Sequence, residues 1–100
     1  MNPPILGSAL SGNLKRVKVY VESGGDINVA DKMGNTLLML AAVDDHFQLV
    51  EYLPRGGADS KRRNKAGESA LDGAKQGAPK RVKRLLATAM HRLNTSRATT

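Results

Sequence analysis

The chain has 100 residues, which suits one small domain, and it contains no cysteine, which excludes a disulfide framework and a cysteine-based zinc site. The formal net charge is +7, and it is uneven: residues 1–50 carry four basic and five acidic side chains, whereas residues 51–100 carry 12 basic and four acidic ones. No apolar run approaches the ~20 residues of a membrane span, and the N-terminus lacks the basic start of a signal peptide. We therefore expect an intracellular protein, cytoplasmic in the first instance with nuclear and organellar locations open, whose second half attracts acidic partners.

The first apolar segments predict a helical hairpin. Pro3 and Pro4 suit the start of a helix, because proline lacks an N–H that the first turn would leave unbonded, and we expect this helix to run to about Ser11. A second helix should cover about 14–23. The loop that follows, GGDINVADKMGNT at residues 24–36, is dense in turn-forming glycine, aspartate and asparagine.

The central segment predicts a second hairpin. Thr36 is a good N-cap, because its hydroxyl can accept a hydrogen bond from an unbonded backbone N–H, and an apolar helix should follow over residues 37–43. After two aspartates, residues 47–55 repeat apolar side chains at helical spacing. Pro54 removes a backbone donor and crowds the carbonyl of Val50, so we expect this helix to end early or to bend.

The C-terminal segment predicts a third hairpin with a long last helix. We expect helices at about 70–76 and from about 79 onward, with Pro79 in the first turn of the last one. Residues 94–100 should form a polar tail. Apolar side chains of the last segment recur at i, i+3, i+4, i+7, i+8 and i+11 as one stripe: Val82, Leu85, Leu86, Ala89, Met90 and Leu93.

The glycine-rich loop belongs to an internal repeat. Residues 57–69, GADSKRRNKAGES, align with residues 24–36 at an offset of 33. A hairpin of two short helices cannot bury its apolar faces alone, so neighbouring hairpins must stack, and the loop carries the chain from one hairpin to the next. The same offset aligns glycines, carboxylates, hydroxyls and apolar residues: Gly24 with Gly57, Asp26 with Asp59, Gly34 with Gly67, Thr36 with Ser69, Val17 with Val50, and Leu38 with Leu71.

The repeated unit resembles the ankyrin repeat. DKMGNTLLMLAAVDDHFQLVEYLPRGGADS, residues 31–60, matches a full unit of that family, and the flanking segments extend the resemblance over roughly residues 4–86. It implies an all-α solenoid of stacked helix-turn-helix pairs joined by β-hairpin-like finger loops, with the fingers and first helices forming a concave binding face. The family's TPLH motif is absent, because residues 36–39 read TLLM and residues 69–72 read SALD.

The resemblance also divides the chain. We expect a single domain over residues 1–93, made of a truncated repeat at 1–30, a central repeat at 31–63 and a C-terminal capping repeat at 64–93. As a cap, the last helix would cover the apolar face of its neighbour and present a polar face to solvent. The alternative is that this basic amphipathic helix docks on a partner or on an anionic membrane surface.

The resemblance implies a non-catalytic protein–protein interaction module. Its partner is another protein, which can belong to a larger complex. The positions without a structural duty are the finger tips and the exposed sites of the first helices. The predicted partner-binding residues are therefore Lys32, Met33, Asn35, Val43, Asp44, Arg63, Lys65 and Glu68.

Two basic clusters, KRRNK at 61–65 and KRVKR at 80–84, keep a second class of function open. Such clusters can contact nucleic-acid phosphates, as in a small structural subunit of an RNA-rich assembly such as a ribosome. Against this stands the scarcity of aromatic residues, since one Phe and two Tyr offer no platform for stacked bases. The candidate contacts to phosphates or acidic surfaces are Lys61, Arg62, Lys80, Arg81, Lys83 and Arg84.

No pattern in the sequence indicates catalysis. The glycine pairs lack the G-K-[ST] of a phosphate loop, and Asp44, Asp45 and His46 are adjacent residues that diverge at a helix N-terminus instead of converging on a metal. The resemblance gives His46 a structural role at the start of the second helix. We expect no enzymatic activity, no cofactor, no metal and no small-molecule substrate.

Overall fold

The computed structural model describes residues 3–74, 84 and 86–87. This part of the chain is helical outside its loops and contains no strand, only an isolated antiparallel bridge between Ala30 and Thr36. The expected all-α fold is confirmed. The helices are α1 (Ile5–Leu10), α2 (Leu14–Glu22), α3 (Leu37–Val43), α4 (Phe47–Arg55) and α5 (Ala70–Ala74).

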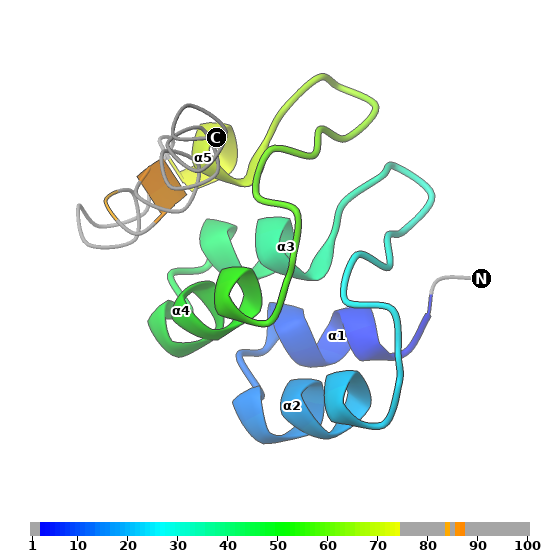
Figure 1. Ribbon diagram of the computed structural model, residues 1–100. Coiled ribbons are helices and arrows are strands. Elements are labelled where there is room, and N and C mark those ends of the chain that lie inside the picture. Colours follow the sequence, from blue (N-terminus) through cyan, green and yellow to red (C-terminus); the bar gives the residue numbers. More distant parts are fainter. Residues whose placement is uncertain (1–2, 75–83, 85, 88–100) are drawn as a thin grey trace, which may run out of the picture.

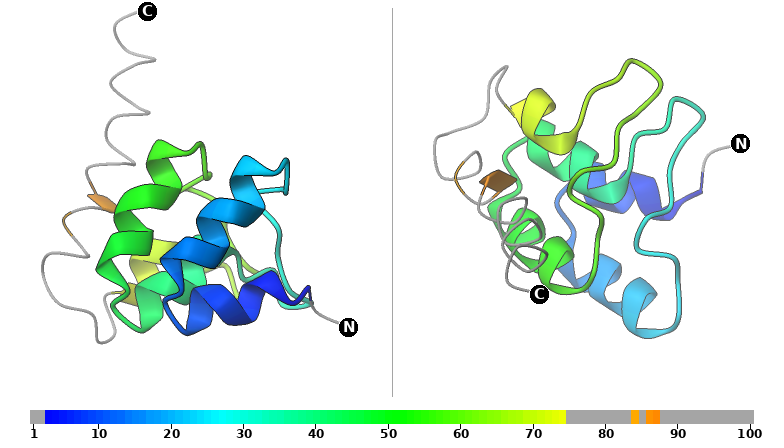
Figure 2. Two further views of the ribbon diagram at one scale, coloured as in Figure 1. Left: turned by 90° about the horizontal axis from the view of Figure 1, so that it is seen from below. Right: turned by 45° about the horizontal axis from the view of Figure 1, so that its top comes forward.

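The helices form two rows. An inner row consists of α1, α3 and α5, with α3 in the middle and packed against both of the others, and an outer row consists of α2 and α4, which pack on α1 and α3 (Figure 1). Two loops that we call finger 1 (residues 24–36) and finger 2 (residues 57–69) project side by side from one edge (Figure 2). Each finger leads from an outer helix to the next inner helix.

The core lies within and between the stacked hairpins. Leu37 and Leu38 of α3 and Leu49 and Leu53 of α4 are at most 1% exposed. A fully buried leucine contributes ~1.5–3 kcal/mol relative to an exposed one, so these four side chains contribute strongly to the stability of the central hairpin. In the outer row, the Lys18 Nζ of α2 lies 5.6 Å from the centre of the Tyr52 ring of α4, a cation–π contact between neighbouring hairpins.

The backbone repeats at the offset of 33 that the sequence predicts. Residues with left-handed backbone recur in pairs. The turns after α1 and α3, the ends of α2 and α4, and the tips of the two fingers therefore have equivalent conformations. The paired φ values are +78° and +56° for Gly12 and Asp45, +97° and +106° for Gly24 and Gly57, and +83° and +80° for Gly34 and Gly67. The repeat is thus confirmed in conformation as well as in sequence.

Thr36 caps α3 as expected, accepting a hydrogen bond from Met39 N at 3.3 Å. Of the two alternatives expected at Pro54, the early end is wrong, because α4 continues to Arg55, whereas the bend stays a prediction. Pro54 occupies the last turn of α4, and Gly56 N–H closes that turn onto the carbonyls of Tyr52 and Leu53. Since only Arg55 follows the proline within α4, the helix loses one backbone donor and still reaches its expected end.

The third hairpin is described in part. The helix expected at 70–76 is α5, and Arg84, Leu86 and Ala87 are helical, with Leu86 fully buried and Arg84 exposed. The start of the last helix near residue 79 and the polar tail at 94–100 lie outside the described residues. So do the other members of the predicted apolar stripe: Val82, Leu85, Ala89, Met90 and Leu93.

Candidate interaction surface

The tip of finger 1 is a closed hairpin. Asp31 N–H donates to the carbonyl of Asn35 at 3.0 Å, and Gly34 N–H donates to the carbonyl of Asp31 at 3.0 Å. The Asp31 carboxylate accepts from Met33 N–H and Asn35 N–H at 2.9 and 2.8 Å, and from the Asn35 side-chain amide at 3.2 Å. The aspartate therefore holds the tip from inside and is not an outward-facing charge.

These contacts also perturb the acidity of Asp31. Burial alone raises the pKa of this carboxyl, but hydrogen bonds from the backbone and side chain of Asn35 and from the N–H groups of Met33 and Gly34 outweigh it. The pKa of Asp31 is held below its ordinary value of 3.8.

Finger 2 builds the same hairpin around an asparagine. Asn64 N–H donates to the carbonyl of Glu68 at 2.9 Å, and Asn64 Oδ1 accepts from Ala66 N–H and Glu68 N–H at 2.9 and 3.0 Å. Asn64 stands 33 residues after Asp31 and performs the same capping. The hairpin thus requires a side-chain oxygen at this position and not a charge.

The two fingers are joined by hydrogen bonds. Lys65 N–H donates to the carbonyl of Met33 at 2.8 Å, and the Asn64 side-chain amide donates to Asn35 Oδ1 at 2.9 Å. Near the base of the fingers, Asp59 N–H donates to Asn28 Oδ1 at 2.8 Å. The fingers therefore form one connected wall.

Gly34 allows the fingers to approach closely. A Cβ built on Gly34 would lie 3.1 Å from the Asn64 Cα, and the backbone at Gly34 is left-handed as well. Both the space and the conformation favour glycine here.

The predicted contact residues divide into outward-facing and internally bonded groups. Lys32 and Met33 on finger 1, Lys65 on finger 2, and Val43 and Asp44 at the end of α3 are exposed, Met33 and Val43 each at 55%. These five side chains are thus exposed to solvent, and their binding role stays a prediction.

The other predicted contact residues make bonds within the protein. The amide of Asn35 is bonded to Asp31 and Asn64. Glu68 is half-buried in its hairpin, where its backbone bonds Asn64. Arg63 Nη1 donates to the carbonyl of Gly67 at 2.6 Å and to Asp72 Oδ2 at 3.2 Å. These bonds favour a structural role for Asn35 and Arg63.

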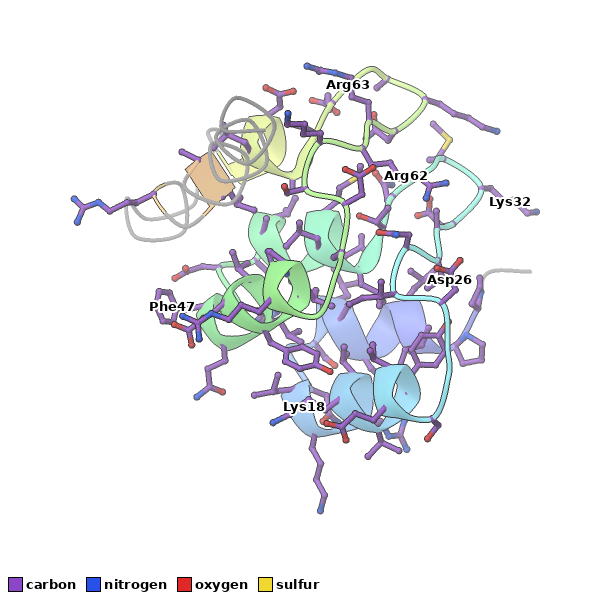
Figure 3. All side chains as sticks on the ribbon, in the orientation of Figure 1. Lys18, Asp26, Lys32, Phe47, Arg62 and Arg63 are labelled. Atoms are coloured by element: carbon purple, nitrogen blue, oxygen red, sulfur yellow. The ribbon has the colours of Figure 1, made fainter. Side chains whose placement is uncertain are left out.

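The basic clusters are described unevenly. Lys61 is half-buried, and the exposed Arg62 reaches back to finger 1, donating from Nη1 to the carbonyl of Asn28 at 3.4 Å. Figure 3 shows Lys32 at the end of finger 1 and Arg63 toward the end of finger 2, with Arg62 between the two fingers and Asp26 at the base of finger 1. Of the second cluster, Arg84 is exposed, whereas Lys80, Arg81 and Lys83 lie outside the described residues.

Sequence reasoning missed one exposed residue of the inner row. Leu10, in the last turn of α1, is 48% exposed and stands 33 residues before Val43. The offset of 33 could have identified Leu10, because it pairs this residue with Val43, a position already predicted to face a partner.

His46 has the structural role expected of it. It is the N-cap residue of α4, and its Nε2 lies 2.7 Å from the carbonyl oxygen of Leu10. This contact spans 36 residues of sequence and ties the second hairpin to the end of α1. Gly12 accommodates the imidazole, since a Cβ at that position would collide with the ring.

Two features are absent from the described part of the chain. It contains no group of three or more histidine, aspartate or glutamate side chains placed to hold a metal ion. No helix in it combines the length and hydrophobicity needed to cross a bilayer.

Stacked helical hairpins joined by paired fingers define a helical-repeat protein of the solenoid class. The family model for ankyrin repeats in three copies matches residues 5–96. The chain belongs to the ankyrin-repeat family, as its sequence pattern indicates.

Individual relatives match parts of much longer proteins. The chain is 31% identical over 84 residues to the potassium channel AKT1 of Arabidopsis thaliana, a match that covers 84% of this chain and 10% of the channel. It is 38% identical over 65 residues to human protein phosphatase 1 regulatory subunit 27, covering 65% of this chain and 42% of that protein. It is 43% identical over 54 residues to protein lin-12 of Caenorhabditis elegans, covering 54% of this chain and 4% of lin-12. The chain thus spans less than half the length of each of these relatives.

Proposed function

We propose that this chain is a non-catalytic module that holds a partner protein on the fingers and on the uncovered sides of α1 and α3. Ankyrin repeats are protein-interaction modules, and the relative named as a phosphatase regulatory subunit is consistent with that role. The binding surface and the lack of catalysis are our inference for this chain.

One observation carries the proposal. Four large apolar side chains are exposed in the described part of the chain, and three of them lie on the fingers and the inner row: Leu10, Met33 and Val43. A single exposed apolar residue is ordinary. Here Leu10 and Val43 occupy equivalent positions on neighbouring helices, and water contact is unfavourable for both, so a partner that covers them gains hydrophobic stabilisation at two adjacent places.

The connected fingers support the same role. Their tips are closed by internal hydrogen bonds, and the two tips are bonded to each other. A loop that is ordered before binding loses less conformational entropy when a partner immobilises it. The two bonded fingers, residues 24–36 and 57–69, are thus preorganised for binding a partner.

Site-specific photo-crosslinking tests this function. A photoreactive residue replaces Met33 or Val43 in the full chain, or Val19 as a matched control, because Val19 is 57% exposed but lies on the outer helix α2. In extract from the native source, we expect a discrete protein adduct from the Met33 and Val43 probes and none from the Val19 probe.

The extract is tested with and without nuclease. Adducts that form only through Val19, or that disappear after nuclease treatment, would contradict a protein partner on the inner face. The nuclease arm also examines the alternative of an RNA-rich assembly.

A further inference from the structure

We infer that a partner protein docks by its backbone on the outer edge of finger 2, which is the side of that finger that faces away from finger 1. The occupant is an extended segment that donates a backbone N–H to the carbonyl of Ala66. This inference rests on the proposed function, since it uses a finger of the same surface, and it adds how the partner is held. It follows from the pairing of the two fingers.

The backbones of the two fingers match closely. Gly34 and Gly67 have φ values of +83° and +80°. Met33 N–H and Ala66 N–H each donate, at 2.9 Å, to the side chain that caps their own finger. Because the backbones match, a group that finger 1 directs toward finger 2 has a counterpart on finger 2 that points the same way along the stack, and therefore away from finger 1.

Finger 1 holds finger 2 through a carbonyl and a glycine. The carbonyl of Met33 accepts from Lys65 N–H at 2.8 Å. Gly34 lets the other backbone pass closely, since a Cβ built there would lie 3.1 Å from the Cα of Asn64. These two features allow the main chain of one finger to pair with the edge of the other.

Finger 2 has the same two features on its outer edge. At the offset of 33, Ala66 stands in the place of Met33 and Gly67 in the place of Gly34. Ala66 is exposed, and its carbonyl accepts no hydrogen bond from the described part of the chain. No described atom lies within 4 Å of a Cβ built on Gly67. An exposed backbone edge of this kind is a template for pairing with another chain.

The repeat in the sequence does not supply a third finger for this edge. A further step of 33 residues pairs Gly57 with Met90 and Gly67 with Thr100, so the glycines that the fingers share do not recur. Among the described residues, finger 1 lies on one side of finger 2 and no finger lies on the other side (Figures 1 and 2). The occupant that fits there in the register of the repeat is therefore a segment of another protein.

The register sets the chemistry of this segment. The partner residue in the place of Lys65 donates its backbone N–H, so it cannot be proline. The residue before it passes Gly67 as Asn64 passes Gly34, with its main chain close to the glycine. The segment is therefore extended at this point, and main-chain hydrogen bonds contribute to its affinity whatever its side chains are.

The test uses a phage-displayed library of random 16-residue peptides. The library is first depleted on an immobilised Gly67→Asn variant and then selected on the immobilised full chain. Asparagine tolerates a left-handed backbone and has room at this position, so the variant should keep its fold, while its side chain obstructs the edge. We expect peptides that bind the full chain at least fivefold more tightly than the variant. Circular dichroism and melting temperature verify the fold.

A matched variant and a modified peptide locate the contact. Gly24→Asn is the control: Gly24 has φ +97°, no atom lies within 4 Å of a Cβ there, and it lies at the base of finger 1. It should change affinity less than twofold. Each backbone nitrogen of a selected peptide is also methylated in turn. Methylation at the pairing position should weaken binding about five- to tenfold, because it removes a hydrogen bond without altering the protein.

The outcomes separate this inference from the proposed function. If no peptide survives depletion, or if the survivors tolerate methylation at every nitrogen, docking by the backbone is wrong. Peptides from an undepleted library that lose affinity for a Leu10→Ser, Val43→Ser variant but bind Gly67→Asn normally would overturn the edge and keep the proposed function. Peptides insensitive to all of these substitutions would overturn both. Self-association of the chain in analytical ultracentrifugation that Gly67→Asn abolishes would assign the edge to a second copy and overturn a separate partner.

Discussion

The two fingers share a backbone but differ in the residue that closes the tip. Asp31 and Asn64 both accept hydrogen bonds from two N–H groups of their own hairpin. Asn64 has a donor as well, and it uses this donor to bond Asn35 of finger 1, which a carboxylate in its place could not do. One side-chain oxygen therefore suffices to fold a finger, whereas an amide at the same position also joins that finger to the preceding one.

The two hairpins that carry these fingers differ in burial. α3 packs against inner helices on both sides, whereas α1 packs against one in the described part of the chain. At equivalent positions, Leu38 is 1% exposed and Ile5 is half-buried. In a stacked repeat, stability depends on neighbours, so the same substitution should have different effects in the two hairpins.

Substitution at the more deeply buried of these two equivalent positions should change the free energy of unfolding more than any of the other substitutions considered below. Leu38→Ala should lower the free energy of unfolding by ~2–4 kcal/mol, because it leaves a cavity in a site without solvent. Ile5→Ala should cost about half as much or less, since part of its side chain already contacts water. Urea denaturation followed by circular dichroism measures both, and equal losses would contradict the claim that α3 is the more deeply packed helix.

The turn between inner and outer helices should show the next effect. Gly12→Ala should destabilise the chain by about 2 kcal/mol, because it places a Cβ at left-handed φ and against the His46 ring. Gly7→Ala is the control: no atom lies within 4 Å of a Cβ there, and Gly7 is helical, so alanine should stabilise by ~0.5–1 kcal/mol. A neutral Gly12→Ala would mean that His46 can leave Leu10 without cost.

Pro54 distinguishes the outer helices, because its equivalent in α2 is Val21. Pro54→Leu restores a donor to the last turn of α4 and should stabilise the chain by about 1 kcal/mol. Val21→Leu adds no donor and should change stability by less than half of that. Thermal melts of the two variants test the comparison, and a lower melting temperature for Pro54→Leu would show that the proline is favoured where it stands.

The smallest effect concerns the finger tips and depends on pH. Asp31→Asn makes finger 1 resemble finger 2 and should change stability at pH 7 by no more than about 1 kcal/mol, since both backbone bonds can be kept. The folded pKa of Asp31 is lowered, so its contribution is complete above the ordinary value of 3.8 and is lost as pH falls through the folded value. Urea titrations between pH 7 and pH 3 should therefore favour the variant increasingly toward acid. A parallel decline of both proteins would contradict the lowered pKa.

Local patterns were sufficient to predict the helices of the described residues. The segments 37–43 and 47–55 were predicted to the residue, because Thr36 and the apolar spacing fix their ends. The offset of 33 predicted the equivalent turns. For the second of these segments, Pro54 also suggested an early end as one of two alternatives, and this early end failed because a proline in the last turn of a helix removes a donor there without preventing the turn from closing.

The contacts between fingers could not be predicted in this way. The bond from Asp59 to Asn28 joins residues 31 apart, and its existence depends on how closely two hairpins stack. The exposure of Lys32 and Val43 was predictable, because Lys32 lies at a finger tip and Val43 at the end of an inner helix. Both kinds of position recur in the repeat. The internal bonds of Asn35 could not be predicted. The same local sequence allows a short polar side chain at a tip to face either solvent or a neighbouring loop.

The bond from Lys65 N–H to the carbonyl of Met33 has a mechanical consequence. A partner that pulls on one finger also loads the other, so the two tips should yield together and not in turn. Force applied through either tip is then shared with both inner helices, α3 and α5, into which the fingers run. The chain should accordingly resist detachment of a bound protein as a unit, with release set by the opening of the whole finger wall.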